Sequence, residues 1–143
     1  MPIVGFNFDK VAAERIAKTI DKVEIRHKVR IKDLAQEELP IKKAEETLKF
    51  YFEYKADYEP KLGNILLEGH LFYVDDPKKI KEIFNNWKKE KKIAQPLMQQ
   101  LMNTILIKCG IKALNLSQEI NMPPHIPLPT LRPQGQRPED YIG

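Results

Sequence analysis

The hydrophobic pattern of this chain changes its period once, and that change limits the folds that the chain can adopt. Up to about residue 74, apolar side chains alternate with polar ones, which is the two-residue period of half-buried strands. From residue 77 onward they recur about every 3.6 residues, the period of an amphipathic helix. Strands followed by helices indicate an antiparallel α+β layout, with the sheet in one layer and the helices in the other.

Three strands are predicted from the alternation. Residues 23–32 and 48–57 alternate apolar and polar side chains regularly, so each is expected to keep one face in water. Residues 64–74 are apolar at both parities, which is typical of a more central strand, and we expect a bend or bulge at Gly69. Residues 59–63 form the hairpin link. In the opening segment, residues 3–8 are a further, shorter strand, and residues 11–20 are expected to form a helical turn or an irregular edge.

Two helices are predicted after residue 75. Asp75 and Asp76 followed by Pro77 give a helix start, with an aspartate N-cap and a proline at the first helical position. The inward stripe of this helix is expected to consist of Ile80, Ile83, Phe84 and Trp87. Pro96 starts a second helix that leaves only a narrow polar side, so it is expected to be nearly enclosed. This helix either stops at Gly110 or runs through it to about Gln118.

The composition changes at Asn121, and this change predicts a domain boundary between residues 1–120 and 121–143. The C-terminal stretch has prolines at positions 123, 124, 127, 129, 133 and 138, a density that forbids a helix and removes donors from any strand. It is expected to be an extended, proline-rich tail. Two interpretations stay open: packing on its own domain through Ile126, Leu128 and Leu131, or contact with a large partner through polar and basic residues that include Arg132 and Arg137.

The sequence gives little support for an enzyme. It has none of the motifs GxGxxG, GxxxxGK[ST], HExxH or GxSxG. His27, His70 and His125 lie far apart in different predicted elements; His27 falls on the apolar side of its strand, where we expect a hydrogen-bonded core or interface histidine. The lone Cys109 is expected to pack in the core. We therefore predict no catalytic residue, no metal site and no cofactor.

No apolar run approaches the length of about 20 residues that a membrane span requires. The N-terminus lacks the basic stretch and apolar core of a secretory signal. We therefore expect a cytoplasmic protein without membrane contact. The net charge of +4 favours polyanionic partners, although only mildly.

The most concentrated charge lies in residues 77–92, where seven lysines stand against two glutamates, for a local charge of +5. One interpretation is a helix surface that contacts nucleic-acid phosphates, and the other is an ordinary solvated helix face. A second basic stripe, on the outer side of the first long strand, supports the phosphate interpretation; it consists of Arg26, Lys28, Arg30 and Lys32. The predicted RNA-binding residues are Lys78, Lys79, Lys81, Lys88, Lys89, Lys91, Lys92, Arg132 and Arg137.

Several segments in order resemble one known family. They are GFNFDKVAAER, KVEIRHKVRIKDL, LKFYFEYKADYEPKLGNILLEGHLFYVDD and, after a helix, LMNTILIKCGIKALNLSQEINMPPHIPLP. Together they resemble the SecB-like proteins of archaea and bacteria, relatives of the protein-export chaperone SecB, over roughly residues 3–130. The resemblance implies a curved antiparallel sheet of about four strands packed on two helices. It also implies frequent homo-oligomers, grooves that hold unfolded polypeptide, and no catalytic residues.

The sequence departs from the export chaperone in two respects. That chaperone is strongly acidic, whereas this chain is basic, and the chain also lacks the Cys-Pro-Asn and Phe-Pro-Tyr run of the chaperone's long helix. Docking on the chaperone's motor partner is therefore not expected. No sequence motif identifies which residues of this chain would form the family's peptide-binding groove. The candidates are therefore the apolar strand positions Phe50, Phe52, Tyr54, Leu66, Phe72 and Val74.

Two functional hypotheses follow. In the first, a SecB-like scaffold binds ribosomal RNA or the ribosome, as a ribosome-associated or archaeal ribosomal protein, through the lysine-rich helix and the tail. The 31% of charged residues is compatible with a thermophile. In the alternative, the protein is a holdase chaperone that binds unfolded polypeptides through an apolar sheet groove. Salt distinguishes them, because phosphate contacts weaken as salt rises whereas apolar contacts persist.

Overall fold

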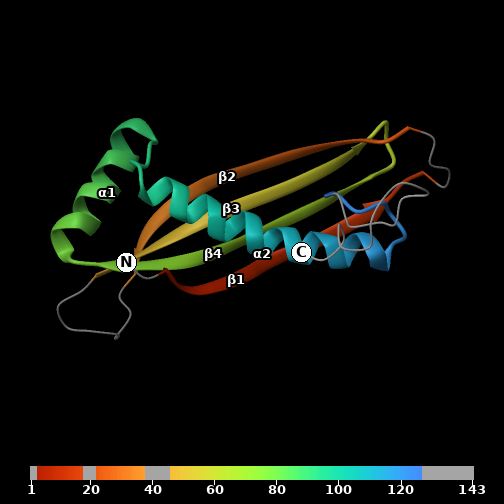
Figure 1. Cartoon of the computed structure of the whole chain (residues 1–143). Coiled ribbons are helices and arrows are strands. Elements are labelled where there is room, and N and C mark those ends of the chain that lie inside the picture. Colours follow the sequence, from red (N-terminus) through yellow and green to blue (C-terminus); the bar gives the residue numbers. More distant parts are fainter. Residues whose placement is uncertain (1–2, 18–21, 38–45, 127–143) are drawn as a thin grey trace, which may run out of the picture.

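The computed structural model describes residues 3–17, 22–37 and 46–126. Four strands come first, β1 (Ile3–Arg15), β2 (Glu24–Glu37), β3 (Glu46–Glu59) and β4 (Gly63–Asp75). Two helices follow, α1 (Pro77–Glu90) and α2 (Leu97–Glu119), and both pack on the same side of the sheet (Figure 1). The predicted α+β architecture, a four-stranded antiparallel sheet with two helices behind it, is confirmed.

The strand order is β1-β4-β3-β2, and every neighbouring pair is antiparallel. The central pair, β3 and β4, is joined by the predicted hairpin link and pairs without interruption from Glu46 opposite Asp75 to Tyr58 opposite Gly63. Lys61 in the link adopts a left-handed backbone, with φ of 52°. Because β3 and β4 lie in the middle of the sheet, their helix-facing side chains form the centre of the core.

The N-terminal strand is longer than predicted. Residues 11–15 were expected as a turn or irregular edge, but they extend β1, with Val11 opposite Leu67 and Ala13 opposite Ile65. Their backbone pairs with β4, a partner about fifty residues away in sequence that the local pattern does not reveal. The expectation was therefore wrong for residues 11–15, while residues 18–20 lie outside the described ranges.

Of the bend or bulge expected at Gly69, the bulge was wrong, since β4 pairs straight through this position with β3. The register shifts lie on the edge strands instead: two in β1, between Val4 and Phe6 and between Phe8 and Lys10, and one in β2, between Ile31 and Asp33. Gly69 is required for another reason. A Cβ atom at this position would lie 2.1 Å from the Asn7 carbonyl oxygen and 2.7 Å from Cζ of Phe52.

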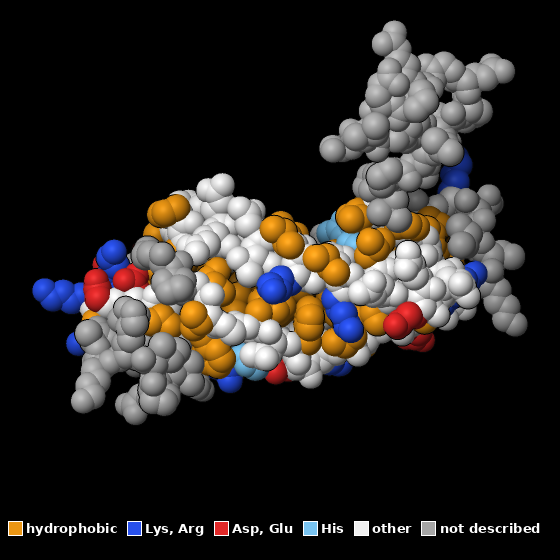
Figure 2. Space-filling view, turned by 60° about the horizontal axis from the view of Figure 1, so that its bottom comes forward, with side chains coloured by type: hydrophobic (Ala, Val, Ile, Leu, Met, Phe, Trp, Pro, Cys, Tyr) orange, Lys and Arg blue, Asp and Glu red, His pale blue; other side chains and the backbone are white. Residues whose placement is uncertain are grey.

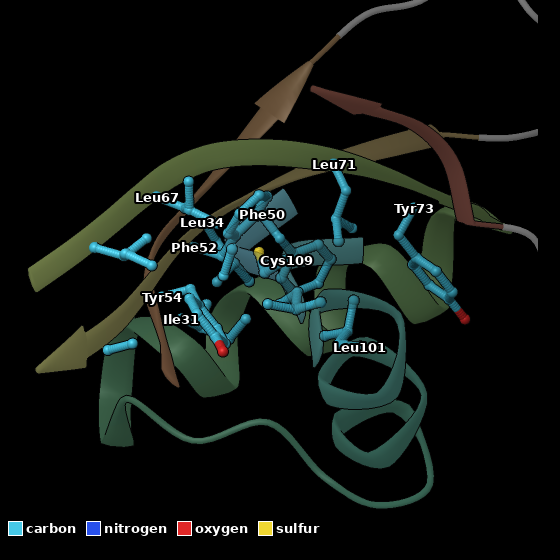
Figure 3. Packing of buried hydrophobic residues seen from close by; sticks show 14 of the residues in the cluster. Ile31, Leu34, Phe50, Phe52, Tyr54, Leu67, Leu71, Tyr73, Leu101 and Cys109 are labelled. Atoms are coloured by element: carbon cyan, nitrogen blue, oxygen red, sulfur yellow. The ribbon is translucent and has the colours of Figure 1, made fainter. Parts of the chain in front are cut away.

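Alternate side chains along each strand point to opposite faces of the sheet, so one set forms the core and the other set lies on the outer face. On β3, Leu48, Phe50, Phe52 and Ala56 are fully buried against the helices, whereas the residues between them face the other way. Figure 3 shows Phe50 and Phe52 in the buried cluster that also contains Leu101 and Cys109 of α2. The predicted core role of Cys109 is confirmed, because this residue is completely buried.

Helix α1 begins as predicted, with Asp76 at the N-cap and Pro77 in the first turn, although the Asp76 side chain makes no capping hydrogen bond. Ile80 and Trp87 are buried, which confirms the predicted inward stripe. The indole Nε1 of Trp87 donates a hydrogen bond to Oδ1 of Asp33, 3.3 Å away. This contact fixes α1 against β2 at one end of the sheet.

Helix α2 lies across β3 and β4 and runs through Gly110 to Glu119, the longer of the two predicted alternatives. Its buried side recurs every fourth residue, as in Leu101, Ile105 and Cys109. The prediction that α2 is nearly enclosed was wrong. Only one side of this apolar helix meets the sheet, since the chain has no third layer of structure in the described residues to cover the other.

The first residues of the proline-rich stretch pack on the sheet. After α2, the backbone N–H of Met122 donates to the Ser117 carbonyl oxygen at 2.8 Å. The Tyr58 hydroxyl donates to the Pro123 carbonyl oxygen at 2.6 Å. Met122 and His125 are buried, at 5% and 4% exposure. The rest of the predicted tail, residues 127–143 with Arg132 and Arg137, lies outside the described residues.

Candidate functional site: an apolar groove beside the second helix

A groove of about 400 Å³ runs between α2 and the part of the sheet formed by β2 and β3. The segment that follows α2 contributes His125 and Ile126 to its lining. We call this site the α2 groove. Its lining residues are His27, Tyr54, Leu106, Ile107, Gly110, Ile111, Leu114, His125 and Ile126. Figure 2 shows hydrophobic side chains on the surface, with histidine among them.

Aliphatic side chains on the rim of the α2 groove are strongly exposed. Ile107 and Ile111 are 63% and 62% exposed, and Leu106 and Ile126 are 46% and 43% exposed. On a helix that covers a sheet, the positions away from the sheet are normally polar. Here they continue the apolar surface from the groove onto the outer side of α2, and a contiguous exposed apolar surface is typical of an interaction site.

Two histidines lie together in the α2 groove, one from β2 and one from the segment after α2. The ring centroids of His27 and His125 are 5.5 Å apart. Neither ring nitrogen of His125 has a hydrogen-bond partner within the described part of the chain, although the residue is only 4% exposed. Burial lowers the pKa of His125, and the neighbouring His27 lowers it further, so that its ring is neutral at pH 7.

Sequence reasoning missed this pair, because residues far apart in sequence gave no reason to place them together. Of the two expected roles of His27, a core or an interface histidine, the core role was wrong, since His27 is exposed and makes no hydrogen bond to another described residue. It lies on the helix-facing side of an edge strand, at a position that α2 does not cover. The only sequence signal that His27 faces the helices was its place among the alternating apolar positions of its strand.

The third histidine, His70, lies on the opposite face of the sheet. Its Nδ1 is 2.8 Å from Oδ2 of Asp9, and its Nε2 is 3.4 Å from Nδ2 of Asn7. This is the only histidine that the described residues pair with a carboxylate. It lines none of the cavities described here, so the pair does not form a catalytic pocket with the other two histidines.

Two ionisable groups under the α2 groove are held neutral. Burial raises the pKa of Tyr54 to about 12, and the adjacent Cys109 and Tyr58 contribute to the shift. Burial also raises the pKa of the Cys109 thiol to about 12. A thiol with such a pKa is a poor nucleophile at neutral pH. The base of the groove is therefore uncharged, as suits an apolar ligand.

The structure divides the six predicted peptide-binding residues between two faces. Phe50, Phe52 and Tyr54 point toward the helices and are at most 2% exposed. Leu66, Phe72 and Val74 belong to the other parity of β4 and face away from the helices; Val74 is 3% exposed. The six cannot line one groove, because a strand sends alternate side chains to opposite faces. Of this set, only Tyr54 lines the α2 groove.

All seven predicted RNA-binding lysines within residues 77–92 are exposed. The ammonium of Lys88 lies 4.6 Å from the ring centre of Phe84, and that of Lys91 lies 5.2 Å from the ring of Trp87. In the described part of the molecule, none of the seven forms an ion pair. These lysines, which we call the α1 lysine ridge, lie on α1 and on the two residues that follow it. Helix α1 is at the end of the sheet remote from the C-terminal end of α2 (Figure 1).

The second predicted basic stripe, on the outer side of β2, is largely neutralised. Arg26 lies 3.5 Å from Glu59, Arg30 lies 3.2 Å from Glu53, and Lys32 lies 3.2 Å from Glu68. The guanidinium of Arg30 lowers the pKa of Glu53 chiefly through its hydrogen bond. The stripe is part of a surface of paired charges, and it adds little to a phosphate-binding face.

A smaller cavity, of about 240 Å³, lies between α1, the link to α2 and the end of β4. Tyr73, Lys79 and Lys92 contribute to its lining, and the Tyr73 hydroxyl donates to Oδ2 of Asp75 at 2.7 Å. Burial and this hydrogen bond both raise the pKa of Tyr73. Two members of the α1 lysine ridge therefore border a second, partly apolar hollow.

The described residues contain no group of three or more histidine, cysteine, aspartate or glutamate side chains that could hold a metal ion. Neither of the helices in those ranges is long and apolar enough to span a membrane.

Comparison with known proteins gives a structural neighbour and no sequence relative. No family model matches the chain, and no curated protein matches it. Among solved structures, the chain is similar to the SecB-like chaperone Rv1957 of Mycobacterium tuberculosis, in complex with a ChAD peptide from the Rv1956 HigA1 antitoxin. The TM-score is 0.53 at 12% identity, over 92% of this chain and 89% of the other. The fold of this chain is therefore SecB-like.

Proposed function

We propose that this protein is a chaperone-like binding protein, without enzymatic activity, that holds extended apolar polypeptide segments in the α2 groove. The observation that carries this proposal is the row of exposed aliphatic side chains along α2, with Ile107 and Ile111 each more than 60% exposed. A structural neighbour that binds a peptide supports it. This is the alternative hypothesis of the sequence analysis, with a different set of contact residues.

The chemistry of the α2 groove suits a polypeptide better than a small polar substrate. Its lining is almost wholly aliphatic and aromatic, and Tyr54 and His125 are neutral at pH 7. Removing apolar surface from water is favourable by about 25 cal/mol per Å², with no requirement for a particular sequence. Such a groove selects for aliphatic content in an extended segment, as expected of a protein that binds unfolded chains.

The test is equilibrium binding of a fluorescently labelled, permanently unfolded polypeptide to the full chain. The double variant Ile107→Ser with Ile111→Ser is expected to lose about tenfold or more in affinity. Burial of the apolar area of each isoleucine contributes roughly 1 kcal/mol to the free energy of binding. The matched control is Val11→Ser with Ile16→Ser, which changes two exposed aliphatic residues that do not line the groove. Equal losses in both variants, or no binding by the wild type, would overturn the proposal.

The α1 lysine ridge supports a second candidate function, the binding of ribosomal RNA. Seven exposed lysines without ion pairs in the described residues present a cationic surface. Such a surface can bind nucleic-acid phosphates independently of sequence. The test is RNA binding at several salt concentrations by the wild type and by a variant with Lys88, Lys89, Lys91 and Lys92 changed to glutamate. RNA binding should weaken steeply with salt and disappear in the variant. Unchanged binding would remove the lysine ridge from the mechanism.

A further inference from the structure

His125 is the polar residue of the α2 groove whose position is hardest to explain by folding alone. Its side chain is only 4% exposed, it lines the groove, and both of its ring nitrogens lack a partner among the described residues. Buried polar atoms in folded proteins are nearly always hydrogen-bonded, because a group removed from water without a new partner destabilises the fold. An orphaned imidazole inside a groove therefore points to a partner that enters the groove.

The chain holds His125 in place through its neighbours and leaves the ring itself free. Tyr58 of β3 donates to the Pro123 carbonyl oxygen, and the guanidinium of Arg15 donates to the carbonyl oxygen of Asn121. The buried Met122 anchors the same segment against the sheet beside Gly63. The ring is thus presented by a fixed backbone, as expected of a group that positions a ligand.

Gly110 leaves room beside the ring. A Cβ atom at Gly110 would lie 3.9 Å from Nε2 of His125, and apart from the adjacent residues and the backbone of α2 itself no other heavy atom of the described residues lies within 4 Å of that point. This glycine stands in the interior of α2, where glycine lowers helix stability relative to alanine. Because the backbone of α2 is helical there, the conformational freedom of glycine is not required for a turn. Its effect is to keep the groove open next to a ring nitrogen.

We infer that His125 hydrogen-bonds the main chain of the polypeptide segment held in the α2 groove, and so fixes the depth and register of that segment. This inference rests on the proposed function. A neutral imidazole carries one donor and one acceptor, which are the complement of a peptide N–H and C=O. An extended aliphatic segment has no other hydrogen-bonding groups, and its backbone groups lose water on entering the groove. Recognition of the main chain also places no condition on the sequence of the bound segment.

The experiment uses one apolar peptide that binds the wild-type protein, and a series in which successive backbone amides are replaced by esters. An ester lacks the N–H donor and has a weaker carbonyl acceptor, while the side chains stay unchanged. For the wild type, we expect one position, or two adjacent positions, where the ester lowers affinity about tenfold. In His125→Phe this dependence on position should vanish. In the control His70→Phe, on the other face of the sheet, it should persist.

A second measurement covers the case in which His125→Phe does not fold. The imidazole nitrogen NMR signals of His125 in the wild type should shift on peptide binding, and shift less with the ester peptide identified above. Binding that no ester position weakens, or an ester penalty that is equal in wild type and His125→Phe, overturns this inference and leaves the proposed function standing. A wild type that binds no apolar peptide overturns the proposed function itself.

Discussion

The Tyr58 hydroxyl lies 2.6 Å from the Pro123 carbonyl oxygen and donates a hydrogen bond to it, which ties an inner strand to the segment that carries His125. Tyr58→Phe removes the hydroxyl donor, so the Pro123 carbonyl oxygen loses this hydrogen bond. We expect the free energy of unfolding to fall by about 0.5–1.5 kcal/mol, measured by urea denaturation. Amide exchange in residues 121–126 should also accelerate.

The control for this variant is Tyr51→Phe. Tyr51 is half-buried on the outer face of the sheet, and its hydroxyl makes no hydrogen bond to another described residue. Its loss should change the unfolding free energy by less than about 0.5 kcal/mol. If both variants lost the same stability, the bond from Tyr58 would not be what holds the segment.

Two glycine-to-alanine substitutions should have opposite effects on stability. Gly69→Ala places a Cβ atom against the Asn7 carbonyl oxygen and the Phe52 ring, so β1 must move away from β4. We expect a loss of roughly 2–4 kcal/mol in unfolding free energy. Gly110→Ala meets only an ordinary contact and should stabilise α2 by about 0.5–1 kcal/mol. Thermal unfolding monitored by circular dichroism measures both changes.

The stability of the protein should fall between about pH 6.5 and the lower folded-state pKa of His125. Its ordinary pKa is 6.5, and burial and His27 lower it in the folded state. The unfolded chain therefore binds the proton first as pH falls, and protonation favours unfolding. The ionisable groups near this ring are His27, Tyr54 and Cys109. Tyr54 and Cys109 are neutral throughout this range because burial raises the pKa of each.

Urea unfolding at pH 7.5 and pH 5.5 measures this effect. His125→Phe should lose less stability across the interval than the wild type does, because it removes the group whose proton uptake differs between the two states. Equal losses in the two proteins would contradict the assignment of this pH dependence to His125.

The Cys109 thiol should not react with a thiol-specific reagent in the folded protein at pH 8. It is completely buried, and its pKa is raised to about 12. In urea the same thiol should react at the rate of an unperturbed cysteine, because the nucleophile is the thiolate. The reaction measured by absorbance therefore reports the opening of the core under α2. Rapid reaction without denaturant would show that α2 separates from the sheet in the native state.

The sequence pattern predicted which elements form, because strand alternation and helix periodicity are local properties. It correctly predicted the buried Trp87 and the start of α1 at Pro77. It failed where an element is completed by a distant partner. Residues 11–15 form a strand because β4 lies beside them, and Gly69 is required by the backbone of β1. Neither relationship is visible in a window of neighbouring residues.

The candidate site was harder to predict, for a related reason. The aromatic strand residues Phe50 and Phe52 suggested a binding groove, but strand parity places them in the core. The exposed Ile107 belongs to a helix that was predicted to be nearly enclosed, since an apolar pattern does not tell how many sides of a helix have a partner. The pairing of His27 with His125 depends on the backward turn after α2, which proline content alone did not predict. The RNA contacts on the α1 lysine ridge stay a prediction.

The placement of the register shifts bears on how the molecule avoids becoming a template for aggregation. All three lie on β1 and β2, the strands at the two margins of the sheet, whereas β3 and β4 pair evenly. An incoming chain that tries to add itself to a margin meets an interrupted ladder, and on β2 it also meets Arg26, Lys28 and Arg30. The two margins of the sheet are therefore poor templates for strand addition, which would be a hazard for a protein with the proposed function of binding unfolded chains.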